Sequence, residues 1–118
     1  MDTRLIGNIG EKLAQEYLIN KKYQIIHKNW TCQAGELDII AEKDGKLVFI
    51  EVKNVRNKFC KPHELLTSSK IKHLHRSIQQ YLLKNDTDKN NWRLDLITIS
   101  NNKLNHYKNI KDSLLRWY

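Results

Sequence analysis

The amino-acid sequence predicts one α/β domain of the α+β type, with helices flanking a central mixed five-stranded sheet. Two segments carry apolar residues at helical spacing, and five shorter segments are rich in apolar and β-branched residues, in the order α-β-β-β-α-β-β. No repeat or Pro/Gly-rich break divides the 118 residues. We therefore treat residues 1–118 as a single domain, which is long enough to bury a hydrophobic core.

The first predicted helix covers residues 4–20, where apolar side chains recur at spacings of three and four. Its apolar stripe consists of Ile6, Ile9, Leu13 and Tyr17. A rotation of about 100° per residue places Glu11 just past the edge of this stripe, next to a row of small and apolar residues. That row contains Gly7, Gly10, Ala14 and Leu18. We therefore expect the Glu11 carboxylate to reach toward the rest of the domain.

The strands follow from apolar runs bounded by turn residues. They are predicted at residues 23–27, 35–42, 46–53, 92–99 and 103–107. Asp44-Gly45 joins the second strand to the third, and this dipeptide between apolar runs is typical of a hairpin. An irregular connection containing Pro62 leads to a second helix, which begins at residue 67 or 68 and ends at residue 84.

The second helix has a clear apolar face, and the chain end has a weaker one. The expected buried residues of the helix are Ile71, Leu74, Ile78, Tyr81 and Leu82. A short helix carrying Ile110, Leu114 and Leu115 is expected to close the chain.

The chain carries a large positive charge. Lys and Arg number 21 against 13 Asp and Glu, which gives a formal net charge of +8 and a pI of about 9.5. Such a field attracts polyanions, so nucleic acid is the first expected partner, although many basic proteins have no specific partner. Because no apolar run could span a membrane and no signal-peptide pattern is present, we expect a cytoplasmic protein without a membrane partner. Cys32 and Cys60 are expected to be free thiols.

The predicted hairpin brings two carboxylates together. If Asp44 and Gly45 form the loop, Lys43 faces Lys46, and counting outward pairs Asp38 with Glu51. The same count pairs Leu37, Ile39 and Ala41 with apolar partners, so one face of the hairpin is expected to be wholly apolar. Directly opposed residues have Cβ atoms roughly 4.5 to 5.5 Å apart, where like charges are destabilising unless something offsets them.

A divalent cation would offset this repulsion. Mg²⁺ takes oxygen ligands, usually one or two protein carboxylates with waters and substrate phosphate. Lys53 lies two residues beyond Glu51 on the same face, where its ammonium can reach a phosphate or orient an attacking water. An alternative fits the spacing equally well: a solvated sheet face on which Glu36 and Lys53 form an ordinary ion pair.

The hairpin resembles a known nuclease core. The segment Gly35-Glu36-Leu37-Asp38-Ile39-Ile40, followed by Val48-Phe49-Ile50-Glu51-Val52-Lys53, resembles PD-(D/E)XK nucleases and, more closely, the bacterial YraN or UPF0102 family of endonuclease-like proteins. The likeness covers nearly the whole chain, from Gly10-Glu11-Lys12-Leu13-Ala14 through Lys70 to Arg93-Leu94-Asp95-Leu96-Ile97, His106 and Asn109. It implies the restriction-endonuclease-like fold that is shared with archaeal Holliday-junction resolvases.

The resemblance also implies roles for individual residues. Asp38 and Glu51 would bind Mg²⁺ or Mn²⁺, the Val52 backbone carbonyl would be a third ligand, Lys53 the catalytic lysine and Glu11 an accessory acidic group. Lys70 would contact a substrate phosphate. This sequence departs from the family pattern in the loop after the last motif, where Val55 replaces an arginine and Arg56 follows one position later, and where Cys60 replaces a glycine.

The function expected from these observations is a metal-dependent DNA endonuclease that acts on branched or structured DNA, with DNA favoured over RNA. Lys70, Lys72, Arg76 and Arg56 are the expected nucleic-acid contacts. The alternatives are a non-catalytic nucleic-acid-binding module on the same fold and a protein-interaction domain. Because related resolvases act as dimers, a homodimer is also considered.

A zinc site and a base-stacking site are the other two kinds of site that the sequence could form. A zinc site from His27, Cys32, Cys60 and His63 is disfavoured, because the paired CxxC spacing is absent. Trp30, Trp92 and Trp117 could stack on bases, but scattered tryptophans are more often core residues.

Overall fold

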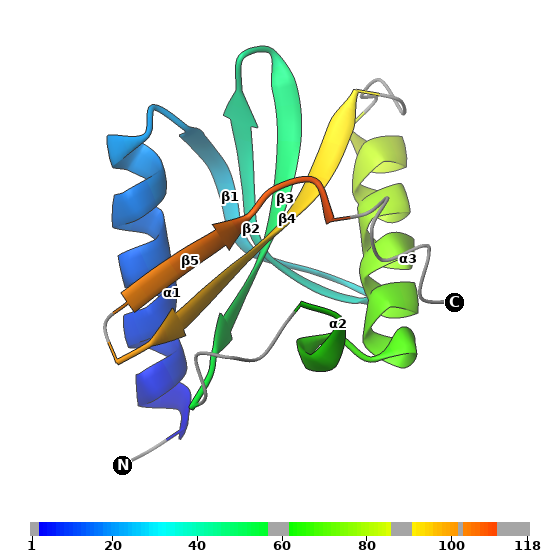
Figure 1. The fold of residues 1–118 in the computed structure, drawn as a ribbon. Coiled ribbons are helices and arrows are strands. Elements are labelled where there is room, and N and C mark those ends of the chain that lie inside the picture. The colour runs from blue at the N-terminus through cyan, green and yellow to red at the C-terminus, as the bar shows by residue number, and fades with distance from the viewer. Residues whose placement is uncertain (1–2, 57–61, 86–90, 102, 111–118) are drawn as a thin grey trace.

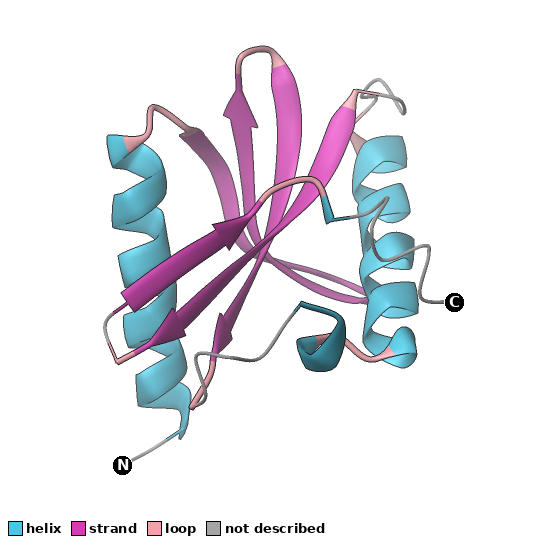
Figure 2. Ribbon diagram, viewed as in Figure 1, coloured by secondary structure: helices cyan, strands magenta, loops and turns pink. Residues whose placement is uncertain are grey.

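The computed structural model describes residues 3–56, 62–85, 91–101 and 103–110, in which a sheet lies between two long helices (Figure 1). The elements are α1 (Thr3–Asn20), β1 (Gln24–Cys32), β2 (Gly35–Lys43), β3 (Lys46–Asn54), α2 (Pro62–Leu65), α3 (Ser68–Lys84), β4 (Trp92–Ser100) and β5 (Lys103–Tyr107). The predicted order is confirmed, with α2 as an additional short helix in the connection after β3 (Figure 2).

The five strands form one mixed sheet with the order β1-β2-β3-β4-β5. Neighbouring strands are antiparallel except β3 and β4, which are parallel. Parallel neighbours need a long crossover, and α2 and α3 supply it between the end of β3 and the start of β4. β3 therefore lies at the centre of the sheet, with a strand on either side.

Two hydrophobic clusters, one on each face of the sheet, form the core. The cluster under α1 contains Ala14, Leu18, Tyr23, Ile39, Ala41, Val48, Ile50, Val52, Ile97 and Ile99. The cluster under α3 contains Leu37, Ile40, Leu47, Phe49, Leu66, Ile71, Leu74, Ile78, Tyr81, Leu82, Leu94, Leu96 and Ile110. Successive strand residues alternate between the two clusters because side chains along a strand point to opposite faces.

Helix α1 packs on the sheet through the buried row of Gly10, Ala14 and Leu18 and through two residues of the predicted stripe, Leu13 and Tyr17, which are partly buried against the same cluster. The predicted stripe is wrong at Ile9, which is 51% exposed, and the side chain of Ile6 lies outside the described part of the chain. A Cβ atom at Gly10 would lie 2.6 Å from Oδ1 of the exposed Asn54 side chain, so glycine leaves room for that side chain beside the end of β3.

Helix α3 has the predicted buried face, to which the structure adds Ser77. The Ser77 hydroxyl donates to the His73 carbonyl oxygen at 2.9 Å, which satisfies this buried polar group. The helix begins after Thr67, whose Oγ1 accepts a hydrogen bond from the Lys70 amide at 3.1 Å. The short closing helix expected around Leu114 and Leu115 lies outside the described residues.

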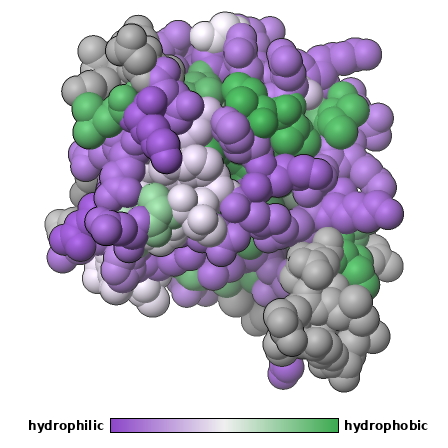
Figure 3. Space-filling view, turned by 180° about the vertical axis from the view of Figure 1, so that it is seen from behind, coloured by the Kyte–Doolittle hydropathy of each residue, from purple (hydrophilic) through white to green (hydrophobic). Residues whose placement is uncertain are grey.

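The surface opposite to that in Figure 1 is mostly hydrophilic, with hydrophobic residues in a broken band (Figure 3). The large hydrophobic residues that are exposed in the described chain are Ile9, Ile19, Ile26 and Leu83. None of the described helices has the length and hydropathy needed to cross a bilayer.

Candidate metal and nucleic-acid site

The hairpin of β2 and β3 has the predicted register over its first five pairs, from Lys43–Lys46 to Ile39–Ile50. Beyond that level the two strands separate, and the predicted ladder pairs Asp38–Glu51 and Leu37–Val52 are not part of the described register. Leu37 packs under α3 whereas Ile39 packs under α1, so the expectation of one wholly apolar face is wrong at Leu37. The hairpin opens at the level of the acidic pair.

The side chain of Asp38 fills the place of the missing strand contact. Its Oδ2 accepts a hydrogen bond from the Val52 amide at 2.9 Å. In a strand the amide and carbonyl of one residue point to the same side, so the Val52 carbonyl also faces the opening beside Asp38. The orientation suits the predicted role of this carbonyl as a metal ligand, which stays a prediction.

Glu51 is buried beside Asp38 and is incompletely satisfied. The residue is 3% exposed, and its Oε2 has no hydrogen-bond partner among the residues that the structure describes. Burial, and next the negative charge of Asp38, raise the pKa of Glu51 to about 7. Burial also raises the pKa of Asp38, against the lowering effect of the Val52 amide and of the Lys70 and Lys53 charges. The two carboxylates therefore lie in one desolvated place where their charges repel.

Two lysines approach this pair from different elements. Lys70 Nζ, on the first turn of α3, lies 3.4 Å from Glu51 Oε1. Lys53, on β3, is partly buried, and its charge lowers the pKa of both carboxylates, as does that of Lys70. The expected lysine is thus present near the pair, and a second one forms the ion pair with Glu51.

Glu11 reaches the same region from α1, as its helical phase predicts. Burial raises its pKa, followed by the negative charge of Asp38. With its amide in the orientation that satisfies its neighbours, Asn29 donates to Glu11 Oε2 and Glu36 Oε1, each at 3.2 Å. Asn29 lies in β1 with a φ of 52°, between the pairs that flank Asp38 in the β1–β2 register. This left-handed conformation suits asparagine and turns its side chain toward α1.

A divalent metal fits this set of donors, with waters and phosphate oxygens completing the shell. Within the described residues no group of three or more His, Cys, Asp and Glu side chains gathers around one point, so the protein offers two carboxylates and a backbone carbonyl. Mg²⁺ and Mn²⁺ sites with one or two carboxylates are of this kind. A cation there would satisfy the unpartnered Glu51 oxygen and offset the repulsion from Asp38.

The predicted nucleic-acid contacts beyond Lys70 lie at the surface. Lys72 and Arg76 are exposed on α3, one turn apart, and Arg56 is exposed just after β3. Figure 1 places the end of β3, the start of α3 and the N-terminal half of α1 at the same end of the sheet. Arg56 therefore follows the strand that carries Glu51, and Lys72 and Arg76 share a helix with Lys70.

The competing sites gain no support. His27 is exposed and Cys32 is partly buried, and neither belongs to a group of metal-ligand side chains among the described residues. Trp30 packs edge-on against Tyr81, and Trp92 against Phe49, as expected of core residues. Cys60, Trp117 and the side chain of His63 lie outside the described parts of the chain.

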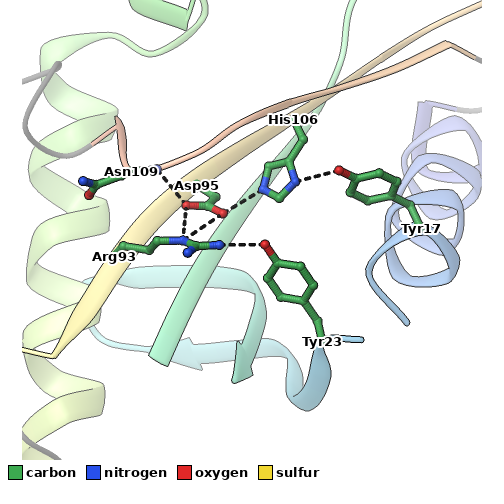
Figure 4. Close-up of polar contacts among 6 residues, drawn as sticks. All are labelled: Tyr17, Tyr23, Arg93, Asp95, His106 and Asn109. Atoms are coloured by element: carbon green, nitrogen blue, oxygen red, sulfur yellow. Dashed lines mark hydrogen bonds and ion pairs between the residues drawn. The ribbon is translucent and has the colours of Figure 1, made fainter. Parts of the chain in front are cut away.

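A second buried polar cluster surrounds Asp95, which is 0% exposed in β4 (Figure 4). Its oxygens bind three groups: Arg93 Nε at 3.0 and 3.3 Å, His106 Nε2 at 2.7 Å and the Asn109 amide at 2.9 Å. Two tyrosines extend the cluster, because Tyr17 OH lies 2.9 Å from His106 Nδ1 and Arg93 donates to Tyr23 OH at 2.6 Å. Burial acts to raise the pKa of Asp95, but these hydrogen bonds outweigh it and lower the pKa.

The Asp95 cluster stabilises the fold and is separate from the pair of Asp38 and Glu51. Leu94 and Leu96 pack under α3, so Asp95 between them faces α1, whereas Glu51 pairs with α3. Burial and the charge of Asp95 raise the pKa of Tyr17, so its phenol stays protonated and is not an activated nucleophile. The cluster joins β4 to α1, to Tyr23 just before β1, to β5 and to Asn109 just after β5.

Sequence reasoning missed the Lys70–Glu51 ion pair and the bridging role of Asn29. Both are contacts between elements far apart in the chain, which hairpin register and helix phase do not supply. One local signal was available: the first turn of α3 contains no acidic residue and places a lysine where a helix usually favours a carboxylate.

Comparisons with known proteins find relatives over nearly the whole chain. Residues 10–99 match the family model described as "Uncharacterised protein family UPF0102". A UPF0102 protein of Caldicellulosiruptor saccharolyticus is 38% identical over 117 residues, which cover 98% of this chain and 92% of the relative. A UPF0102 protein of Alkaliphilus oremlandii is 40% identical over 111 residues, which cover 88% of this chain and 95% of the relative.

Among solved structures, the crystal structure of SSO0001 matches with a TM-score of 0.48 at 17% sequence identity. The match covers 91% of this chain and 52% of SSO0001, so this chain spans about half the length of that protein. At this similarity the match carries no argument about function.

Proposed function

The chain belongs to the UPF0102 family, and because that family is uncharacterised we propose its function from the site itself: a nuclease that uses Mg²⁺ or Mn²⁺ to hydrolyse phosphodiester bonds. The observation that carries the proposal is the buried Asp38–Glu51 pair, in which one carboxylate oxygen has no partner and two ammonium groups are close by. A purely structural pair of like charges would be costly to bury.

The residues divide the work of hydrolysis. Asp38 and Glu51, with the Val52 carbonyl, would hold the ion, which would supply Lewis-acid stabilisation of the phosphate charge and an activated water. Asp38 is oriented for this by the Val52 amide, which donates a hydrogen bond to its Oδ2. Lys53 would orient the water or neutralise charge on the phosphate, and Glu11 would assist from α1 as an accessory acid.

We propose DNA as the substrate, in branched or otherwise structured form, cut by an endonuclease that acts as a homodimer. The net charge of +8 and the exposed Lys72, Arg76 and Arg56 support a polyanionic substrate. The branched form and the dimer rest on the resemblance to the resolvases. Binding through these surface charges would weaken steeply with salt, since each phosphate contact releases counterions.

The test is a cleavage screen of purified protein with Mn²⁺ against branched, single-stranded and duplex DNA and against RNA. Glu51→Ala should abolish cleavage while far-UV circular dichroism and thermal unfolding show a folded protein. Glu42→Ala is the matched control, because it removes an exposed carboxylate from the same hairpin. Wild-type protein that binds Mn²⁺ yet cuts none of these substrates would contradict the nuclease assignment.

A second candidate function is a nucleic-acid-binding module without catalysis, favoured by the exposed basic residues of α3. Calorimetric titration with Mn²⁺ separates the two functions. The nuclease predicts a divalent site that Asp38→Asn removes, whereas the binding module predicts no metal uptake and DNA affinity that a chelator leaves unchanged.

A further inference from the structure

Lys70 occupies a position where a lysine is unfavourable for the helix. Thr67 caps α3, and Lys70 is the third residue after it, in a first turn that contains no acidic residue. The N-terminus of a helix carries a partial positive charge, so a cation there is repelled, and capping motifs commonly place Glu or Gln at this position. The sequence thus keeps a lysine against a local preference, which calls for a compensating partner.

Glu51 is that partner, and the start of α3 holds the lysine over it. The Thr67 hydroxyl fixes the Lys70 amide at 3.1 Å, and the buried Leu66 and Ile71 flank this turn on the apolar side. Lys70 Nζ then lies 3.4 Å from Glu51 Oε1 while the lysine side chain remains 38% exposed. The ammonium therefore contacts a buried carboxylate and still has a path to water.

Lys70 and a metal at this site would act on the same carboxylate. Lys70 Nζ contacts Glu51 Oε1, whereas the unpartnered oxygen that a cation would satisfy is Oε2. In the metal-free protein the charges of Lys70 and Lys53 offset part of the negative charge of the two carboxylates. A dication at Oε2 would repel the ammonium at Oε1 and share the one negative charge of Glu51 with it, so metal would weaken the hold of Glu51 on Lys70.

We propose that Lys70 is a built-in counter-ion of Glu51 that divalent metal displaces, and that the released ammonium then binds a phosphate of the nucleic acid. The inference rests on the proposed function, because it assumes metal at Asp38 and Glu51. It adds a coupling: metal binding frees the Lys70 ammonium at the surface at the start of α3, so metal strengthens nucleic-acid binding and nucleic acid strengthens metal binding.

The first measurement is Mn²⁺ affinity by calorimetry, without nucleic acid. Lys70→Gln should bind Mn²⁺ about tenfold more tightly than wild type, a typical size for coupling between two ligands. Lys72→Gln removes the same charge from an exposed position two residues away and should change the affinity by less than about twofold. Lys70→Arg keeps the charge and should stay close to wild type.

The second measurement is the affinity for a short labelled DNA duplex by fluorescence anisotropy, in EDTA and in Mn²⁺, with the probe confirmed intact on a gel. Wild type should bind more tightly in Mn²⁺, and Lys70→Gln should lose most of that gain although its metal site is filled more readily. Lys72→Gln should weaken binding in both conditions by a similar factor. If Lys70 had only a structural role, its replacement would not raise the affinity for Mn²⁺ and at the same time lower the gain in DNA affinity that Mn²⁺ gives.

The outcomes separate this inference from the proposed function. If wild type binds Mn²⁺ but Lys70→Gln binds it equally or more weakly, the counter-ion role is overturned and the metal site stands. If neither wild type nor any variant takes up metal, both the inference and the metal-dependent function fail. If Lys70→Gln keeps the gain in DNA affinity that Mn²⁺ gives wild type, Lys70 does not contact a phosphate of the nucleic acid.

Discussion

Glu51→Gln should stabilise the metal-free protein at high pH while it removes metal binding. The reason is that the folded state raises the pKa of Glu51 from 4.5 to about 7, through burial and the charge of Asp38. A raised carboxylate pKa means that the folded protein holds the proton more tightly than the unfolded chain does. At a pH where the Glu51 carboxyl ionises, the folded state is therefore destabilised relative to the unfolded chain. A glutamine at this position does not ionise and so does not have this free-energy cost.

The magnitude follows from the size of the pKa difference. Each pKa unit is worth about 1.4 kcal/mol, so ionising Glu51 in the folded state costs on the order of 3 kcal/mol. The pKa of about 7 already includes the favourable charges of Lys70 and Lys53, so we expect Glu51→Gln to be more stable by on the order of 3 kcal/mol above pH 7. The difference should be absent below pH 4.5, grow up to about pH 7 and stay constant above it.

The assay is urea denaturation of wild type and Glu51→Gln in EDTA, at a series of pH values from 4 to 8. At pH 8, addition of Mn²⁺ should raise the stability of wild type and leave the variant unchanged, since a ligand stabilises only the state that binds it. A variant that is less stable than wild type at pH 8 in EDTA would refute the reasoning, because Glu51 would then contribute to stability as a charged group.

Three further substitutions test the supports of the site. Asp95→Asn should destabilise by about 3 to 5 kcal/mol in urea denaturation, because it leaves the buried His106 and the partly buried Arg93 without the carboxylate that they bind; a loss below about 1 kcal/mol would contradict this stabilising role. Gly10→Ala should change the stability by no more than about 1 kcal/mol, because its Cβ would meet only the movable end of the exposed Asn54 side chain, at 2.6 Å, and alanine favours the helix; a loss above about 3 kcal/mol would show that Asn54 cannot move. Thr67→Ala should lower the free energy of unfolding by about 1 kcal/mol, because α3 loses its N-terminal cap. Thermal unfolding measures this loss, with Ser69→Ala as the exposed control. An equal loss of stability in both variants would argue against the cap.

Local patterns in the sequence predicted the elements and the chemistry of the hairpin. The Asp44-Gly45 turn fixed the register of β2 and β3 through Ile39–Ile50, and the spacing of apolar residues gave the buried face of α3. The prediction failed where packing between elements decides. Ile9 has the spacing of a buried residue yet is exposed, because α1 turns the row of Gly10, Ala14 and Leu18 toward the sheet.

The candidate site shows the same difference between what local sequence patterns predict and what packing between elements decides. Asp38, Glu51 and Lys53 lie on one hairpin, so counting residues predicted that they lie in one region, although the counted ladder pair of Asp38 and Glu51 does not form. Lys70 and Asn29 arrive from α3 and β1, and their contacts depend on how those elements pack against β2 and β3. The Asp95 cluster draws on five segments of the chain, which is why the role of Asp95 stayed open in the sequence and became clear only in the structure.

The opening of the hairpin also gives the molecule an internal reporter. The Val52 amide donates to a carboxylate instead of to a neighbouring strand, so its proton senses the charge on Asp38 directly. In a ¹H–¹⁵N NMR spectrum this one resonance should shift when a cation or a proton reaches Asp38, while amides of the Ala41–Val48 pair stay in place. Occupancy of the site could then be followed residue by residue, without a substrate and without knowing what the substrate is.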